Sequence, residues 1–223
     1  MSQTAILIDG GFYRKRAAKL WGKKTSSERA KELIAYCHAH LRNKDGSESR
    51  KLYRIFYYDC EPLEKRSVFH PFLKTNIDLD KSETYTWTIN FFSELKKLRK
   101  VALRFGTLTS QCHYNLQPET TKKLFLGKLS LEQVTEKDFL FIAPQKGVDM
   151  KIGIDIASLA YKKQVDQIIL ISGDSDFVPA AKLARREGVD FILDPMWSPI
   201  KDDLFLHIDG LQSQWKKNKP SVL

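Results

Sequence analysis

Short apolar runs alternate with helical patterns along most of the chain, and this alternation constrains the fold more than any other feature. Helical spacing predicts one helix that opens at Ser27 and Glu28 and closes before Lys44. Three further helices are expected over Thr86–Arg99, Val148–Lys162 and Phe177–Glu187. The strands expected between them are Ala5–Ile8, Leu52–Tyr58, Val101–Leu108, Gln167–Ser172 and Val189–Leu193. Strands that alternate with helices build a parallel sheet covered on both faces.

The composition narrows the class of protein and the kind of partner. The chain has 223 residues, of which 42% are hydrophobic, so it can bury a core and is not disordered. Its 37 Lys and Arg exceed its 27 Asp and Glu, which gives a net charge of +10. An excess of this size favours a polyanionic partner, nucleic acid before membrane.

We expect one main domain over residues 1–200, followed by a C-terminal extension over 201–223 that ends in a basic tail, Trp215–Lys219. Residues 109–144 show no clean periodicity and are expected to form an irregular excursion from this domain.

Features that would indicate an oxidising or membrane environment are missing from the sequence. Cys37, Cys60 and Cys112 form no CxxC pair, which argues against a disulfide framework or a zinc knuckle. No run approaches the ~20 apolar residues of a membrane span, and Ala5–Ile8 is too short for a signal-peptide core. We therefore expect a cytoplasmic protein without membrane contact, and the oligomeric state stays open.

Acidic residues follow two of the expected strands. Asp9 leaves the first strand, and Asp174 and Asp176 follow the strand Gln167–Ser172. Ligands of parallel sheets bind beyond the carboxyl ends of the strands, so these carboxylates are expected at one functional edge. For Asp9 a simple turn role before two glycines stays open, and for Asp174 a helix-capping role.

A third source of acids at this edge is the helix that begins near Gly147. At 100° per residue, Asp149 falls on the apolar face between Ile156 and Ala160, where an acid needs a partner. Asp155 falls at the edge of the polar face and needs none, so Asp149 is the stronger candidate.

Clustered carboxylates repel one another, and a divalent cation would relieve that repulsion. Mg²⁺ prefers oxygen ligands, bridges to phosphate oxygens and can activate a water molecule. An acid cluster on a basic protein therefore predicts hydrolysis of phosphodiester bonds.

Basic and aromatic residues near this edge are candidates for nucleic-acid contact. They are Phe12, Arg14, Lys15, Lys146 and Lys151, with Lys146 preferred for a substrate phosphate. For the basic run that begins at Arg14, a solvated surface is an equally weighted alternative.

Three segments carry a family resemblance: Ile8-Asp9-Gly10-Gly11, Lys146-Gly147-Val148-Asp149 and Ser172-Gly173-Asp174-Ser175-Asp176-Phe177-Val178-Pro179. They resemble the NYN domain family, specifically the LabA-like branch of PIN-like ribonucleases, over roughly residues 4–195. The resemblance implies a PIN-like three-layer α/β/α sandwich with a mostly parallel central sheet.

The resemblance also implies roles for individual residues. Asp9, Asp149, Asp174 and Asp176 would be catalytic and would bind Mg²⁺ or Mn²⁺, and Asp155 joins the metal ligands only through the resemblance. Many relatives place Asn three residues after the first Asp, where this chain has Phe12. This departure puts the efficiency of cleavage in question more than the fold.

Our leading hypothesis is a metal-dependent ribonuclease that cleaves single-stranded or flexible RNA with a metal-activated water. The alternative is a non-cleaving RNA-binding or regulatory module of the same fold. A phosphatase acting on small phosphoesters ranks last, because no second Asp stands two residues after Asp9.

Overall fold

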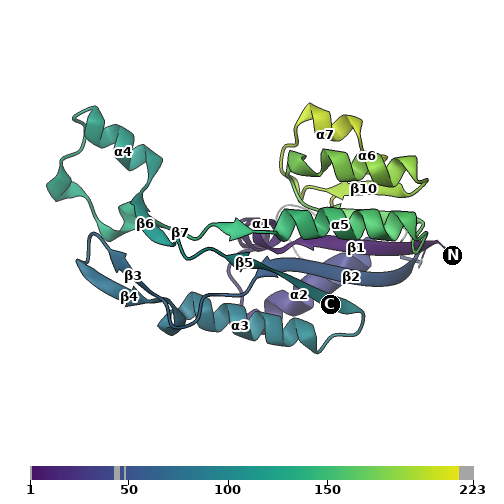
Figure 1. The fold of residues 1–223 in the computed structure, drawn as a ribbon, viewed down its shortest axis with the longest axis horizontal. Helices are drawn as coiled ribbons and strands as arrows, with labels where there is room; N and C mark the ends of the chain where they lie inside the picture. Colours follow the sequence, from purple (N-terminus) through teal and green to yellow (C-terminus); the bar gives the residue numbers. More distant parts are fainter. Residues whose placement is uncertain (1, 43–45, 48, 216–223) are drawn as a thin grey trace.

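The computed structural model describes residues 2–42, 46–47 and 49–215, and its centre is a seven-stranded sheet (Figure 1). The strand order is β11-β10-β9-β1-β2-β5-β8, and every neighbouring pair is parallel except β5 and β8. This confirms the predicted parallel sheet. The strands are β1 (Gln3–Asp9), β2 (Lys51–Cys60), β5 (Val101–Leu108), β8 (Gln145–Lys146), β9 (Gln167–Ile171), β10 (Asp190–Asp194) and β11 (Gly210–Leu211).

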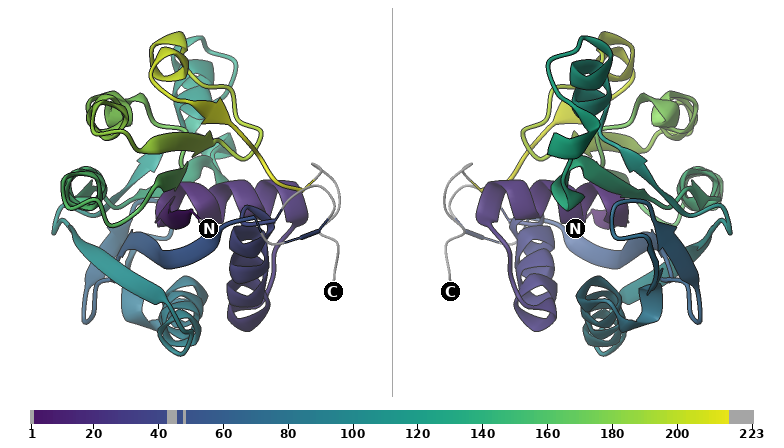
Figure 2. Two further views of the ribbon diagram at one scale, coloured as in Figure 1. Left: turned by 90° about the vertical axis from the view of Figure 1, so that its right-hand side faces the viewer. Right: turned by 90° about the vertical axis from the view of Figure 1, so that its left-hand side faces the viewer.

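Helices cover both faces of the sheet, as Figure 2 shows when it is viewed from either end. In β1 the side chains alternate: Ala5 and Leu7 pack with one helix layer, and Ile6 and Ile8 with the other. One layer holds α5 (Val148–Tyr161) and α6 (Val178–Arg186), and the other α1 (Gly10–Trp21), α2 (Ser26–Ala39) and α3 (Glu83–Lys96). The result is the expected three-layer α/β/α sandwich.

Capping residues explain where two predicted helices begin. The Thr25 side chain accepts a hydrogen bond from the Glu28 amide, and the Glu28 carboxylate accepts one from Thr25, so α2 opens at Ser26. The Ser82 hydroxyl accepts from the Tyr85 amide, so α3 begins three residues earlier than expected.

Helix α1 occupies a segment that the sequence analysis treated as a turn followed by a basic run. Tyr13, Ala17 and Trp21 are buried at four-residue spacing, which is one face of a helix. Gly10 and Gly11 at its start obscure this pattern. The first turn is stabilised instead by Asp9, whose carboxylate accepts a hydrogen bond from the Phe12 amide.

The two ends of the segment 109–144 lie together, because the Thr109 amide donates to the Pro144 carbonyl at 2.9 Å. The expected irregularity is wrong. The segment holds an antiparallel pair of strands, and its ordered elements are too short for periodicity to reveal. These elements are β6 (His113–Leu116), α4 (Pro118–Phe125), η2 (Leu131–Gln133), η3 (Glu136–Asp138) and β7 (Phe139–Ile142).

A second hairpin joins this excursion to form an arm that projects from one end of the sheet (teal and blue, left in Figure 1). The hairpin consists of β3 (Ser67–His70) and β4 (Thr75–Asp78), followed by η1 (Leu79–Lys81). The His70 and Tyr114 rings lie 4.2 Å apart and connect the two parts.

The described part of the predicted C-terminal extension belongs to the sheet. After α7 (Asp202–Leu206), β11 pairs with β10 as its edge strand, and the Ser213 hydroxyl donates to the buried Asp194 carboxylate. The basic tail beyond Trp215 lies outside the described residues. Across the described ranges, no helix has the length and apolar character needed to cross a bilayer.

Candidate active site

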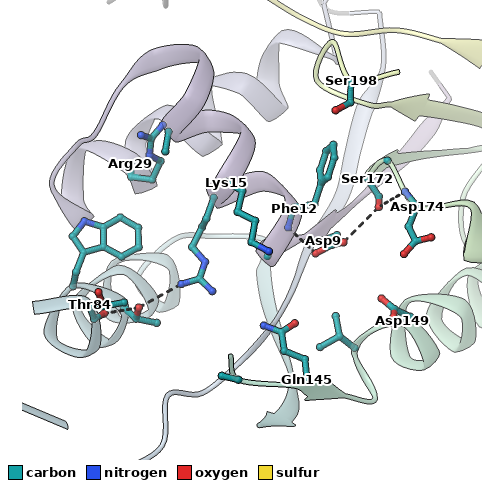
Figure 3. A pocket seen from close by; sticks show the side chains of 18 of the residues that line it. Asp9, Phe12, Lys15, Arg29, Thr84, Gln145, Asp149, Ser172, Asp174 and Ser198 are labelled. Carbon is teal, nitrogen blue, oxygen red and sulfur yellow. Dashed lines mark hydrogen bonds between the residues drawn. The ribbon is translucent and has the colours of Figure 1, made fainter. Parts of the chain in front are cut away.

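A cleft of about 1140 Å³ lies beyond the carboxyl ends of β1 and β9, between α1, the start of α3 and the start of α5 (Figure 3). Asp9, Asp149 and Asp174 line it together. The cleft therefore brings together three of the four acids expected to be catalytic, from one strand end, one loop and one helix.

Asp9 is held in place by its role as a helix cap. Its Oδ1 accepts from the Phe12 amide at 3.0 Å, and its Oδ2 accepts from the Ser172 hydroxyl at 3.5 Å. The same Ser172 oxygen accepts from the Asp174 amide at 3.3 Å. Ser172 thus connects the ends of β1 and β9, and Asp9 caps helix α1 where the sequence left a turn role open, while its functional role stays a prediction.

Asp174 lies directly before the short helix η4 (Ser175–Phe177), and Asp176 lies within it. The Asp174 carboxylate accepts from the Asp176 amide at 3.0 Å, so the expected capping role is also present. Both side chains are exposed, and Asp176 lies at the rim, outside the residues that line the cleft.

Asp149 lies in the first turn of α5 and is exposed, so its expected position on a buried stripe is wrong. The stripe itself is real, because Val148 and Ile152 are buried. The first turn of α5 lines the cleft through Val148 and Asp149, so Asp149 faces the cleft instead of the core.

Burial and neighbouring carboxylates raise the pKa of two acids of the cleft, Asp9 and Asp149. The pKa of Asp9 is raised to about 6 by burial, assisted by repulsion from Asp149, Asp59 and Asp174 and opposed by the Phe12 amide. The pKa of Asp149 is raised by partial desolvation at the cleft wall and by repulsion from Asp174 and Asp176. The site therefore holds more negative charge than its protein surroundings compensate.

Asp155 is directed elsewhere. Its carboxylate accepts from the Tyr58 hydroxyl at 2.7 Å and pairs with Arg104 at 3.2 Å, and it does not line the cleft. The expectation that it needs no partner is wrong, because six residues along α5 place it about 240° around the helix from Asp149, over β2 and β5.

Two of the expected basic contacts also lie outside the cleft. Gln145 lines it, so strand alternation directs the neighbouring Lys146 away. Lys151 follows Asp149 by two residues and lies about 200° around α5. Phe12, Arg14 and Lys15 do line the cleft, as expected.

A buried ion pair beside Asp9 was missed from the sequence. Asp59, at the end of β2, is fully buried and pairs with Arg14 at 2.9 Å. A Cβ on Gly10 would lie 2.6 Å from the Asp59 Oδ2 atom, so only glycine fits there. Asp59 comes at the end of a strand, as Asp9 does, and this position in the sequence could have identified it as a residue near the site.

The other side of the cleft is basic. Lys15, Lys23 and Lys201 are exposed there, and in the described structure they form no ion pair. Lys24 and Arg29 also line the cleft but are paired with Glu32. Figure 3 shows Lys15 on α1 and Arg29 on α2, on the side of the cleft away from Asp149 and Asp174.

An aromatic residue that the sequence analysis did not single out closes the basic end. Trp87 lines the cleft, stacks on Phe91 with ring centroids 5.0 Å apart, and donates its indole N–H to the Lys24 carbonyl at 2.9 Å. The cleft thus combines an acidic end, cations and two aromatic walls, Phe12 and Trp87.

The donor set fits a hard divalent cation. The converging groups are carboxylates, and Asp9, whose pKa is raised mainly by burial, is also repelled by Asp149, Asp59 and Asp174, a repulsion that such a cation would relieve. Within the described ranges, no three His, Cys, Asp or Glu side chains are arranged to hold one ion among them. Mg²⁺ bound through one or two carboxylates, with water and phosphate as further ligands, is compatible with this arrangement.

A three-layer sandwich with acids at the carboxyl edge of a mostly parallel sheet is compatible with a PIN-like fold. The NYN domain family model matches residues 75–200, more than half of the chain, and the chain belongs to this family. The match includes Asp149 and Asp174 and begins after Asp9. The expected family is therefore confirmed, whereas the LabA-like branch stays a prediction.

Other comparisons add little. The chain is similar to the crystal structure of a protein of unknown function from Vibrio parahaemolyticus RIMD 2210633. The two are 13% identical, with a TM-score of 0.48 over 97% of this chain and 95% of that chain. No functionally curated protein matches the chain significantly.

Proposed function

We propose that this protein is a divalent-metal-dependent ribonuclease that hydrolyses single-stranded or flexible RNA in the cleft. The observation that carries the proposal is that Asp9, Asp149 and Asp174 converge opposite the basic side of the cleft, formed by Lys15, Lys23 and Lys201. Membership of the NYN family supports it, because NYN domains are PIN-like, nuclease-like and generally associated with RNA.

Asp9 and Asp149 would hold a Mg²⁺ or Mn²⁺ ion, with Asp174 beside them and Asp176 at the rim. The ion would supply a Lewis acid that lowers the pKa of water and stabilises charge on the leaving oxygen. Ser172 and the Phe12 amide orient Asp9 through the hydrogen bonds described above.

The basic side of the cleft would have a separate role, which is to bind the RNA backbone. Lys15, Lys23 and Lys201 would contact the phosphates of the RNA backbone, which attract exposed cations. Phe12 and Trp87 would stack against unpaired bases, and this favours a single strand over a duplex. Arg14 forms an ion pair with Asp59, so we assign it a structural role in the wall of the cleft.

The direct test incubates the purified protein with RNA and DNA oligonucleotides, with Mn²⁺, with Mg²⁺ or with EDTA. RNA cleavage that requires the metal and is lost in Asp174→Asn supports the proposal. Cleavage that persists in EDTA or in Asp174→Asn, with contaminating nuclease excluded, refutes it. The matched control is Asp155→Asn, which removes the same charge outside the cleft.

A second candidate is a non-cleaving RNA-binding module of the same fold. Phe12, an apolar side chain in the wall next to Asp9, favours it, because the ring cannot hydrogen-bond to substrate or water. This candidate predicts salt-sensitive RNA binding without product, and Asp9→Asn would leave that binding within about twofold.

A further inference from the structure

A second hollow, of about 380 Å³, lies at the edge of the sheet opposite the cleft. It is formed where α2 ends, β2 begins and α3 leads into β5 (right in Figure 1). Six of the residues that line it carry a basic side chain: His38, Arg42, Arg50, Lys51, Arg99 and Lys100. We call this group the basic hollow.

The charge of the basic hollow is uncompensated within the described structure. The residues that line it include no Asp or Glu, and its five Lys and Arg side chains take part in none of the ion pairs among the described residues. Cations gathered in a concave surface repel one another and attract an anion. The cleft differs, because three of its cations are already paired with acids.

Two of the cations are held in place, and three are free to meet a ligand. Arg50 donates to the His40 carbonyl at 3.3 Å, and the Lys100 ammonium donates to the Leu52 carbonyl. Arg42, Lys51 and Arg99 are exposed, and their side chains have no hydrogen-bond or ion-pair partner among the described residues. The hollow therefore combines two hydrogen-bonded cations with three exposed cations that are unpaired among the described residues.

Two packed helices connect the basic hollow with the cleft. Helix α2 contributes Arg29 to the cleft at its start and His38 to the hollow at its end. Helix α3 contributes Trp87 to the cleft, and Arg99 follows it at the hollow. Each helix has 14 residues and is about 20 Å long. A stacked strand advances about 3.4 Å per nucleotide, so about six nucleotides cover this distance.

We propose that the basic hollow is a second anion-binding site, which holds backbone phosphates of an RNA whose other part occupies the cleft. The inference rests on the proposed function for the identity of the ligand. Its consequence is a dependence on length: RNA shorter than about six nucleotides occupies the cleft alone, and longer RNA gains the second contact.

The test compares two double variants that remove the same charge from opposite sides of the sheet. Arg42→Gln with Arg99→Gln removes two exposed cations of the hollow. Lys162→Gln with Lys182→Gln removes two exposed cations on the α5 and α6 side. Both are made in an Asp174→Asn background, and binding is measured with RNA of about five and about sixteen nucleotides.

For the longer RNA, loss of two phosphate contacts should reduce the slope of log affinity against log salt by about 1.4. Raising the salt from about 50 to 200 mM weakens RNA binding by some factor, and this factor should be about sevenfold smaller for the hollow variant than for the control variant. Binding of the shorter RNA should change by less than about twofold in both variants. Equal behaviour of the two double variants with the longer RNA would overturn the inference.

A further experiment distinguishes binding of RNA phosphates in the hollow from binding of free phosphate. Inorganic phosphate is added at an ionic strength matched with chloride. If phosphate selectively weakens binding of the longer RNA to the parent protein and not to the hollow variant, phosphate and RNA compete for the hollow, and the assignment to RNA is supported. If phosphate instead raises the thermal stability of the parent and not of the hollow variant, while both bind the longer RNA equally well, the site binds free phosphate and the assignment to RNA is overturned. Because binding is measured without cleavage, failure of the nuclease proposal is read separately in the cleavage assay.

Discussion

The raised pKa of Asp9 predicts that neutralising this residue stabilises the protein. A carboxyl group that binds its proton more tightly when folded than when unfolded lowers stability wherever it is ionised. Asp9→Asn removes this penalty and keeps the cap on α1, because Asn and Asp are equally good helix caps.

The magnitude follows from the size of the shift in the pKa of Asp9. The pKa rises from 3.8 to about 6, which corresponds to about 3 kcal/mol at pH values above both. The penalty is absent below about pH 4, grows as the pH rises, and is complete above about pH 6. The expected gain in unfolding free energy is therefore about 3 kcal/mol at about pH 7.5 and about 1.6 kcal/mol at about pH 5.

The assay is urea unfolding in EDTA at these two pH values, with thermal unfolding as a second measurement. For a chain of this length, 3 kcal/mol raises Tm by about 6–12 °C. Asp155→Asn is the matched control, because it removes a carboxylate that is paired with Arg104 outside the cleft. That variant should be unchanged or less stable by under about 1 kcal/mol.

Two results would refute this reasoning. The first is an Asp9→Asn variant no more stable than the parent at about pH 7.5. The second is a gain of the same size at both pH values, which would show that the ionisation of Asp9 is not its cause. Confirmation would mean that stability is lost at this position to keep a charge in the cleft, as is common at functional sites.

Three further predictions concern the surroundings of the cleft. In Gly173→Ala, the new Cβ would lie 2.8 Å from the Phe12 ring, so we expect a loss of about 1–3 kcal/mol in urea unfolding; unchanged stability would show that the ring moves freely. Asp59→Ala leaves the Arg14 charge without its buried partner and should cost about 3–5 kcal/mol in the same measurement; a cost below about 1 kcal/mol would contradict the importance of this pair. Asp155→Asn should keep the rate of RNA cleavage within about twofold of the parent, and a tenfold loss would return Asp155 to the catalytic group.

The sequence predicted the framework of the fold well. Runs such as Ala5–Ile8 are uniformly apolar because both faces of a central parallel strand are buried, and this is visible without a structure. Helix α1 and the short elements of the arm were missed for a local reason. The two glycines after Asp9 resemble a turn, and a four-residue strand carries too few positions to show a period.

The acids of the site were predictable because they depend on topology. Asp9 and Asp174 follow strands that run in the same direction, so any parallel pairing brings them to one edge. Asp59 follows the same rule, and only its burial beside Arg14 separates it from the cleft acids.

The tertiary structure decides which basic side chains line the cleft. Lys146 and Lys151 stand next to the right residues in sequence, but strand alternation and the turn of α5 direct them away from the cleft. Lys23, Lys201 and Trp87 come from separate elements and meet there only because those elements pack together. A periodic pattern reports which face of one element is buried, whereas a charged surface is assembled from the exposed faces of several. The sequence by itself therefore determined the sheet and the acids at its edge, and only the packing of the helices decided which cations surround them.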